Sequence, residues 1–426
     1  MAHPPVHVGI DPVEVPAVKL GEGTQVLPCP QDEGLVGFAG KVERRLTAQL
    51  LPLAVLLEYN QPENRRANLT RGGGSARFRC GLLVLVLLPG VTSEFGLIAR
   101  LRRLVGSAGS ESPDLLVGIG DDAALWRLGD RIVAATTDTL VDGVHFRPDI
   151  TGWADLGWKA LAVNLSDLAA VGAIPRFALI TLGLPPSVGS DPVELIYQGL
   201  LELARTSGTV LAGGDIVRSP VLTITVGLFG EVEVPAGADW RSRVLLRSSA
   251  RPGEVVAVTG VLGGAAAGLR LLLSDPQGAE TRAPGLVRAY RRPRPRLDVA
   301  PILVGAGVRA AIDVSDGLVA DLGHVCEESG IGAEIEAGRV PVHPEAARHF
   351  GPEGLILALT GGEDYELVFT GPEAVIARVA VQSPIPVTVI GRTSDGPPGR
   401  VRVVGPDGKE LTLPRGGWDH LATEGA

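Results

Sequence analysis

The sequence is poor in cysteine and in aromatic residues. Its three cysteines, Cys29, Cys80 and Cys326, lie far apart and form no Cys-x-x-Cys pair. This spacing argues against a disulfide framework or a zinc site and favours a reducing, cytoplasmic compartment. Because aromatic residues make up only 4% of the chain while hydrophobic residues make up 45%, the core is expected to consist of Leu, Val, Ile and Ala.

Long hydrophobic runs and an excess of positive charge are also missing. The apolar segment 81–88 is shorter than the roughly 20 residues that a membrane-spanning helix needs. It also lies too far from the N-terminus for an ordinary signal peptide. The formal net charge of −9 provides no general basic surface, which argues against nucleic acid as a partner. We therefore expect a cytoplasmic protein without a membrane or nucleic-acid partner.

The length of 426 residues is more than one hydrophobic core usually supports, so two globular units are expected. Residues 1–91 are rich in Pro, Gly and Arg and show little periodicity apart from one possible helix over 40–58. They are expected to form a disordered extension. From Ser93 onward strands alternate with helices, which predicts an α/β domain over 92–250 and an α+β domain over 251–426.

Local patterns place the elements within these domains. Thr151 is in position to cap a helix, and Asp191-Pro-Val-Glu194 has the form of a capping box with Pro at the first helical position. The run 291–296, Arg-Arg-Pro-Arg-Pro-Arg, is expected to be a stiff basic connector that leads into another helix. Helices are expected over 94–105, 153–171, 191–205, 263–273 and 317–329, and strands over 130–137, 176–184, 210–212, 222–232, 254–259, 310–314, 366–370 and 387–390.

The familiar nucleotide-binding motifs are absent. Gly263-Gly-Ala-Ala-Ala-Gly268 has the glycine spacing of a P-loop, but Leu269 and Arg270 stand where Lys and Ser or Thr are required. The segment is therefore expected to be a tight turn onto a helix that packs against a sheet. Gly118-x-Gly120 is not continued to a third glycine, so a dinucleotide-binding fold is poorly supported.

Carboxylates recur beside glycines and hydroxyl groups along the chain. Asn164 and Asp167 lie three residues apart on one predicted helix and hence on one face of it. Carboxylates that converge on one cleft repel one another unless cations lie between them. Oxygen ligands of this kind suit Mg²⁺, which usually also holds substrate phosphates. The pattern therefore predicts a metal-dependent enzyme that acts on phosphates.

These acidic segments belong to a longer ordered series. The series consists of Glu94-Phe-Gly-Leu-Ile98, Gly118-Ile-Gly-Asp-Asp122, Thr136-Thr-Asp-Thr139 with Gly143-Val-His-Phe146, Trp158-Lys-Ala-Leu-Ala-Val-Asn-Leu-Ser-Asp167, Gly213-Gly-Asp215, Asp313-Val-Ser-Asp-Gly317, Gly361-Gly-Glu-Asp-Tyr365 and Gly417-Trp-Asp-His420. In this order, and over about 93–421, the chain resembles the thiamine-monophosphate kinases. That family belongs with the ATP enzymes that have the fold of aminoimidazole-ribonucleotide synthetase. Two departures are Ile216, where many members have Thr or a small polar residue, and the extension, which has no counterpart.

The resemblance implies a fold, a reaction and a partner. An N-terminal α/β half forms a homodimer by joining sheets, and an α+β C-terminal half completes the active site. The implied reaction is direct, in-line transfer of the γ-phosphoryl group of ATP to thiamine monophosphate, giving thiamine diphosphate and ADP, with several Mg²⁺ ions and no phosphoenzyme. A phosphate monoester is largely ionised near neutral pH, because its second pKa is about 6. No strong general base is then required, and positioning and charge screening account for catalysis.

The resemblance also implies the roles of individual residues. The catalytic residues are Asp122, Asp138 and Asp167. The expected metal ligands are Asp122, Thr136, Thr137, Asp138, Asp167, Asp215, Asp313 and Asp316. The expected contacts with ATP are Tyr197, Gly214, Asp215, Arg247 and Ser315, and those with thiamine monophosphate are His145, Glu363 and Trp418. Trp418 offers an aromatic face to a cationic thiazolium ring.

Other interpretations remain open at this point. Tyr197 and Trp418 could simply pack, Asp313 and Asp316 could cap the following helix, and the choice of Arg247 among neighbouring arginines is uncertain. The chain could be another ATP enzyme of the same superfamily, one that makes an aminoimidazole ribotide or a selenophosphate. It could also be a non-catalytic scaffold of that fold, although no expected metal ligand is missing.

Overall fold

The computed structural model describes residues 94–107 and 112–414. The predicted extension over 1–91, with its possible helix, Cys29 and Cys80, lies outside the described residues, and so does Trp418. The described residues belong to the compact unit Val91–Ala426.

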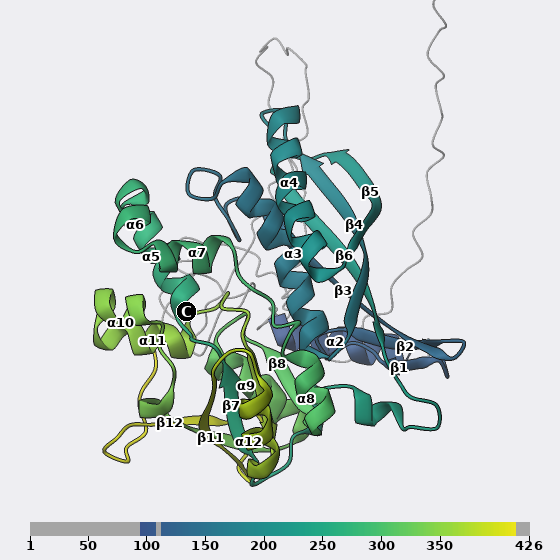
Figure 1. Ribbon diagram of the computed structural model, residues 1–426, viewed down its shortest axis with the longest axis vertical. Helices are drawn as coiled ribbons and strands as arrows, with labels where there is room; N and C mark the ends of the chain where they lie inside the picture. Colours follow the sequence, from purple (N-terminus) through teal and green to yellow (C-terminus); the bar gives the residue numbers. More distant parts are fainter. Residues whose placement is uncertain (1–93, 108–111, 415–426) are drawn as a thin grey trace, which may run out of the picture. The chain divides into compact units, whose positions relative to one another are not determined.

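The first sheet has six strands in the order β1-β2-β3-β6-β4-β5. Neighbouring strands run antiparallel, except that β4 and β5 are parallel. β5 therefore forms one edge of the sheet. The strands are β1 (Leu115–Val117), β2 (Ala124–Leu128), β3 (Arg131–Val141), β4 (Ile174–Leu184), β5 (Val210–Arg218) and β6 (Thr223–Val232), shown in Figure 1.

Two helices, α3 (Trp153–Ala170) and α4 (Ser190–Ser207), lie side by side against the first sheet (Figure 1). They approach closely because a Cβ at Gly157 would lie only 1.9 Å from the Ile196 carbonyl oxygen. α3 is buried around most of its circumference, as expected of a helix that is covered on all sides. It contacts β3 and β6 of this sheet and also β8 of the second half, so its side chains reach both.

Both predicted helix caps are wrong. α3 begins after Gly152 without a side-chain cap, and Thr151 is instead buried in the preceding turn. α4 begins at Ser190 after Gly189, so Asp191 lies in the first turn rather than at the cap. An acidic side chain in the first turn still interacts favourably with the helix dipole.

β5 extends to Arg218, although the sequence pattern predicted a strand that ends at residue 212. Gly213 and Gly214 continue the strand with φ angles of 152° and 156°. A Cβ at Gly214 would lie 1.7 Å from the Ile180 carbonyl oxygen, so only glycine allows this close approach to β4. The pair of glycines looked like a strand end in the sequence and is a strand interior in the structure.

The second sheet also has six strands, in the order β12-β9-β11-β7-β10-β8. Neighbouring strands run antiparallel, except that β9 and β12 are parallel. The strands are β7 (Val255–Thr259), β8 (Ala310–Asp313), β9 (Gly332–Glu336), β10 (Leu367–Gly371), β11 (Val387–Ser394) and β12 (Val401–Val404).

α2 (Glu94–Ser107) precedes the first sheet in the chain, and further helices belong to the second half. Those of the second half are α5 (Gly264–Ser274), α6 (Pro276–Arg282), α7 (Pro284–Arg291), α8 (Ala300–Ala306), α9 (Leu318–Ser329), α10 (Pro344–Phe350), α11 (Pro352–Thr360) and α12 (Glu373–Gln382). The sequence patterns predicted α2, α5 and α9 to within a few residues and a helix after the basic connector. They missed α6, α7, α10, α11 and α12, each of at most 10 residues, because so short a helix shows little periodicity.

The buried core is mainly aliphatic, as the composition predicted. One hydrophobic cluster joins the two halves, because Ala169, Ala170 and Leu245 pack with Val299 and Leu303. No helix among the described residues is long and apolar enough to cross a membrane.

The basic connector over 291–296 also links the two halves. Arg292 forms an ion pair with Asp155 in α3, and Arg296 forms one with Glu366 beside β10. These arginines therefore hold structural contacts in addition to stiffening the chain.

Candidate active site

Three carboxylates converge where α3 meets both sheets. One oxygen from each of Asp122, Asp167 and Asp313 lies within 4.8 Å of the others. Asp122 precedes β2, Asp167 lies on α3, and Asp313 is the last residue of β8. The cluster, which we call the acidic cluster, therefore draws ligand atoms from both halves of the chain.

Hydrogen bonds between α3 and β3 fix the position of this cluster. The Thr136 hydroxyl donates to Asp167 Oδ2 at 2.5 Å, and the Asp138 backbone N–H donates to Asn164 Oδ1 at 3.0 Å. Asn164 has no exposed surface, and its amide donates to the Ala160 carbonyl oxygen at 3.1 Å. The predicted shared face of Asn164 and Asp167 is thus the face that contacts β3.

The charges of the cluster oppose one another. Burial and the neighbouring Asp138 and Asp313 carboxylates raise the pKa of Asp167 well above its usual value. Burial and the Asp122 carboxylate raise the pKa of Asp313 to about 8. Asp122 Oδ2 and Asp313 Oδ2 are buried and have no hydrogen-bond partner among the described residues. Buried carboxylate oxygens without a donor are costly, so the arrangement suits a bound cation.

Arg247 contacts the acidic cluster. Its guanidinium forms an ion pair with Asp122, whose side chain is 1% exposed. Although burial lowers the pKa of Arg247, the Asp122 carboxylate raises it overall. The Arg247 backbone N–H donates to Asp121 Oδ2 at 3.2 Å, and burial raises the pKa of Asp121 to about 7. The sequence predicted a contact of Arg247 with ATP, and the structure places it on a predicted metal ligand.

The loop between β8 and α9 carries Ser315 and Asp316 beside the cluster. Asp321, in the first turn of α9, accepts hydrogen bonds from the backbone N–H groups of Asp316 at 3.1 Å and Gly317 at 2.9 Å. Asp321 is 2% exposed, so this buried carboxylate fixes the backbone of the loop. The N-cap residue of α9 is Gly317, which has no side chain to cap the helix, so the role of Asp316 in capping stays a prediction.

The Gly361–Tyr365 turn lies against the same loop. The Glu363 backbone N–H donates to the Ser315 carbonyl oxygen at 2.8 Å, and the Tyr365 N–H donates to that of Val314 at 2.9 Å. The Glu363 side chain forms an ion pair with Lys159 of α3 at 2.6 Å. Glu363, a predicted contact of thiamine monophosphate, and Ser315, a predicted contact of ATP, are therefore neighbours.

Asp364 explains the segment that resembles a P-loop. Its carboxylate accepts hydrogen bonds from the backbone N–H groups of Gly263 at 2.6 Å and Ala265 at 3.1 Å, at the N-terminus of α5. Burial raises the pKa of Asp364 to about 7. Because an internal carboxylate occupies the donors that a phosphate would need, the segment is the turn onto a helix that the sequence predicted.

Two predicted ligands lie elsewhere on the first sheet. Alternate side chains of β3 point to opposite faces, so Thr136 and Asp138 face α3 whereas Thr137 faces away. Asp215 in β5 pairs in register with Thr181, and both belong to the face away from α3. The row from Asp138 runs through β6 and β4 to Gly214. This is three strand spacings, or roughly 14 Å, so a single chain does not bring Asp215 to the acidic cluster.

The remaining predicted contacts are placed individually. His145 lies in the turn after β3, where its Nδ1 accepts a hydrogen bond from the Val141 N–H at 3.1 Å. Tyr197 is half-buried on α4 and packs against the first hydrophobic core. Trp418 lies outside the described residues.

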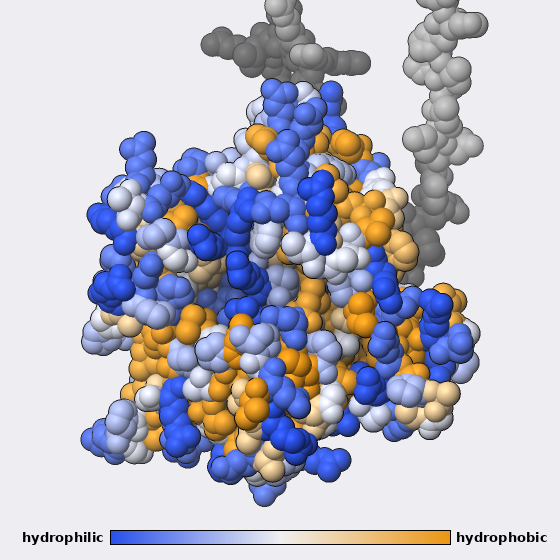
Figure 2. All heavy atoms as spheres, viewed as in Figure 1, coloured by the Kyte–Doolittle hydropathy of each residue, from blue (hydrophilic) through white to orange (hydrophobic). Residues whose placement is uncertain are grey.

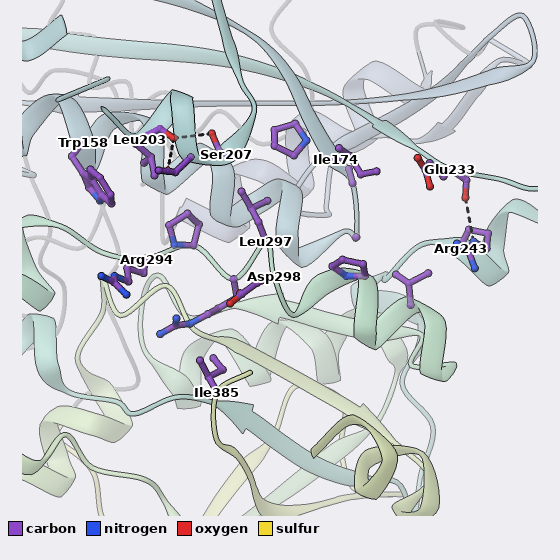
Figure 3. A pocket seen from close by; sticks show the side chains of 18 residues that line it. Trp158, Ile174, Leu203, Ser207, Glu233, Arg243, Arg294, Leu297, Asp298 and Ile385 are labelled. Atoms are coloured by element: carbon purple, nitrogen blue, oxygen red, sulfur yellow. Dashed lines mark hydrogen bonds between the residues drawn. The ribbon is translucent and has the colours of Figure 1, made fainter. Parts of the chain in front are cut away.

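One cavity that the structure shows is separate from this site. It has a volume of about 760 Å³ and lies between the end of α3, α4 and the basic connector. Figure 3 shows Trp158, Arg294, Leu297 and Asp298 around it. Among the described residues that line it, none is a predicted site residue.

Sequence reasoning missed several residues that position the site. They are Lys159, Asp121, Asp321, Asp364 and the pair Arg296–Glu366. A usable signal existed for Lys159, because a lysine within the apolar helix segment 158–163 requires a buried counter-charge. The other contacts join residues far apart in the sequence, and no local pattern indicates them.

Comparisons with known proteins agree with this geometry. Residues 120–232 match the N-terminal domain, and residues 251–404 the C-terminal domain, of AIR synthase related proteins. The two sheets that frame the acidic cluster are thus the two domains of that class of protein. Within it, the chain is 42% identical over 335 residues to the thiamine-monophosphate kinase of Escherichia coli, covering 78% of this chain and 98% of that protein. It therefore belongs to the thiamine-monophosphate kinase family, which is a family of enzymes.

Two further relatives extend the comparison. The thiamine-monophosphate kinase of Bacillus subtilis is 36% identical over 312 residues, covering 72% of this chain and 93% of that protein. A solved structure described as "AaThiL complexed with AMPPCP and TMP" is 34% identical, with a TM-score of 0.66, and covers 77% of this chain and 97% of that one. The described fold is therefore shared with enzymes of this family.

Proposed function

We propose that this chain transfers the γ-phosphoryl group of ATP to thiamine monophosphate, giving thiamine diphosphate and ADP, in a reaction that requires Mg²⁺. The observation that carries the proposal is the convergence of Asp122, Asp167 and Asp313 from both domains within 4.8 Å. The relatives named for this reaction, and the one described with AMPPCP and TMP, support the choice of substrates.

The acidic cluster fits Mg²⁺ by its chemistry. Its donors are carboxylate oxygens, two of which, Asp122 Oδ2 and Asp313 Oδ2, are buried without a hydrogen bond among the described residues. We propose that Asp122, Asp138, Asp167 and Asp313 hold the ions, with Thr136 and Asp316 at the edge of the site. When bound, Mg²⁺ would screen the charge between the two anionic substrates and stabilise the transferring phosphoryl group.

The protein residues have the task of positioning rather than of covalent chemistry. An oxygen of thiamine monophosphate attacks the γ-phosphorus as the bond to ADP breaks, and the acceptor is already ionised near neutral pH. Cys326, the cysteine among the described residues, is fully buried, and burial raises the pKa of its thiol to about 12. This side chain is therefore unsuited to form a phosphoenzyme.

Two of the predicted ATP contacts lie at the acidic cluster in this proposal. Ser315 lies beside the acidic cluster, and Arg247, now on Asp122, can exchange that carboxylate for a phosphate oxygen when cations occupy the cluster. Glu363 and His145 are proposed to contact thiamine monophosphate. Glu363 is attached to the Ser315 loop, so both substrates would be held by connected parts of the backbone.

A second copy of the chain would supply the ligands that lie on the other side of the sheet. The face of the first sheet away from α3 exposes Phe177 and Val210 at 52% and 54%, next to the edge strand β5. Figure 2 shows apolar side chains gathered at the upper right, where β4 and β5 lie in Figure 1. An exposed apolar sheet with an open edge favours pairing with an identical chain. We propose a homodimer in which Thr137 and Asp215 of one chain complete the site of the other.

The test of the reaction is an ADP-release assay with ATP and Mg²⁺. Turnover with thiamine monophosphate, and none with thiamine or with a formylglycinamidine ribotide, is expected. Turnover of the ribotide would instead indicate the purine branch of the superfamily. ATP binding without turnover of any of the three would support a non-catalytic scaffold.

The test of the homodimer mixes two inactive variants, Asp167→Asn and Asp215→Asn. If each site takes Asp215 from the other chain, half of a random mixture is heterodimer with one intact site, and roughly a quarter of wild-type activity returns. If Asp215 acts within its own chain, the mixture stays inactive. Sedimentation of the wild-type protein checks the dimer itself.

A further inference from the structure

Lys159 is a cation in a fully buried position. Its side chain has no exposed surface, although it lies in an otherwise apolar segment of α3. Its Nζ lies 2.6 Å from Glu363 Oε1 and 4.1 Å from the centre of the Tyr290 ring, and Tyr290 is 2% exposed. Lys159 is thus held between a carboxylate and an aromatic face, both of which stabilise an ammonium group.

The contact between Lys159 and Glu363 is an ion pair without the alignment of a hydrogen bond. Nζ has no hydrogen-bond partner among the described residues. The Glu363 side chain, in contrast, keeps 26% of its surface exposed. Its charge is therefore balanced from the buried side while part of the carboxylate stays within reach of a ligand.

The backbone under Glu363 is held just as firmly. Glu363 and Tyr365 have φ angles of 67° and 50°, a region that residues other than glycine rarely adopt. Their N–H groups donate to the carbonyl oxygens of Ser315 and Val314, which keeps the turn in this conformation. The backbone is thus fixed by the Ser315 loop, and the side chain is fixed by Lys159.

We propose that Lys159 is a positioning residue that orients the Glu363 carboxylate as a hydrogen-bond acceptor for the amino group on the pyrimidine ring of thiamine monophosphate. This inference rests on the proposed function and adds to it a residue that never touches the substrate. Because the ammonium already balances the carboxylate charge, Glu363 recognises the substrate by the direction of a hydrogen bond rather than by attracting the thiazolium cation. Loss of the ammonium frees the carboxylate to rotate and removes that directionality.

The experiment measures KM for both substrates in Lys159→Met, Glu363→Gln and the double variant, together with the melting temperature. Lys159→Met is expected to raise KM for thiamine monophosphate by about tenfold or more, the cost of about one lost hydrogen bond to a charged group. KM for ATP is expected to stay within about twofold, because the interaction serves one substrate. KM for thiamine monophosphate in the double variant is expected to be no higher than in the more impaired single variant, since both substitutions remove the same interaction.

A second substrate separates positioning from a merely structural role. Oxythiamine monophosphate, in which the pyrimidine amino group is replaced by an oxygen, lacks the donor. The wild-type protein is expected to prefer thiamine monophosphate, and Lys159→Met is expected to lose most of that preference. Arg292→Met is the matched control, because it removes a cation that touches the neighbouring Trp158 ring and pairs with Asp155, away from Glu363. It is expected to lower the melting temperature and leave both KM values and the preference unchanged.

The outcomes are distinguishable. If the wild-type protein turns over thiamine monophosphate and Lys159→Met leaves its KM unchanged, or raises both KM values equally, this inference is wrong and the proposed function stands. Additive effects in the double variant would also overturn it. If the wild-type protein does not turn over thiamine monophosphate, both proposals fail.

Discussion

Two acidic regions of this protein differ in how their charge is balanced. In the acidic cluster, Asp122, Asp167 and Asp313 face one another, and among the described residues one guanidinium, that of Arg247, is paired with them. In the turn after α11, Glu363 pairs with Lys159, and Glu366 pairs with Arg296. We call the second region the balanced turn.

The difference indicates what each region is for. Repelling carboxylates in a buried place are unstable by themselves and suit cations from outside the chain. Carboxylates that each pair with a cation of the chain need no bound metal ion. Their role is to fix the conformation of the backbone and the direction of a side chain. The unbalanced region is therefore the expected site of metal and phosphate, and the balanced turn is the expected frame for the organic substrate.

The largest effect should come from Asp167→Asn, which removes one charge from the acidic cluster. We expect the rate of ADP release with thiamine monophosphate to fall by about 10²–10³-fold or more, because a group that stabilises developing charge is lost. Asp130→Asn makes the same chemical change in the exposed turn between β2 and β3 and should keep wild-type activity. Equal losses in both variants would contradict the distinction.

The next effect concerns the balanced turn. Glu366→Gln leaves the mostly buried Arg296 guanidinium without its carboxylate. Breaking a buried pair from one side typically costs about 3–5 kcal/mol, so the free energy of unfolding should fall by that order. Urea unfolding of the purified variant measures it. Glu373→Gln is the control, because it breaks the exposed pair Arg392–Glu373, and an exposed ion pair contributes little.

Magnesium should stabilise the protein through the acidic cluster. At a concentration of 100 times the dissociation constant, a ligand that binds the folded state adds about 2.7 kcal/mol. A thermal scan with and without Mg²⁺ should show this increase for the wild-type protein and for Glu366→Gln, and little of it for Asp167→Asn. A rise of equal size in all three proteins would place the ions elsewhere.

The last effect involves His324, which lies outside both regions but near the Arg247 charge. Burial and Arg247 lower the pKa of His324 to about 4, from 6.5. The folded protein then binds fewer protons than the unfolded chain between these pH values, so stability is present above about pH 6.5 and is lost as the pH falls towards 4. His324→Phe keeps the stacking on Phe95 and should lose less stability between pH 7 and pH 4, by about 3 kcal/mol. Equal losses of stability in both proteins would show that the pKa of His324 is not lowered in the folded protein.

The sequence predicted the long elements well and the small ones poorly. β3, α3 and α4 are 11 to 18 residues long, whereas α10 and α11 are short, and β5 contains two glycines that resemble a strand end. The predicted division of the chain and the predicted role of residues 1–91 stay predictions.

The candidate site was predictable in identity but not in arrangement. Local motifs identified Asp122, Asp167 and Asp313, and the structure brings them together. The separation of Asp215 from them follows from strand order, which no local motif contains. Lys159 was visible as a charge within an apolar helix, but its partner Glu363 lies about two hundred positions further along the chain. Only the folded structure shows which distant segments pair.

The most direct test of the difference between the two regions is urea unfolding of wild-type protein, Asp167→Asn and Glu366→Gln in buffer with a chelator. Removing a repelling carboxylate should leave the free energy of unfolding of Asp167→Asn equal to or above that of the wild type, while Glu366→Gln falls well below it. If Asp167→Asn is instead destabilised as strongly as Glu366→Gln, the acidic cluster is balanced within the chain, and its assignment as the metal site is wrong.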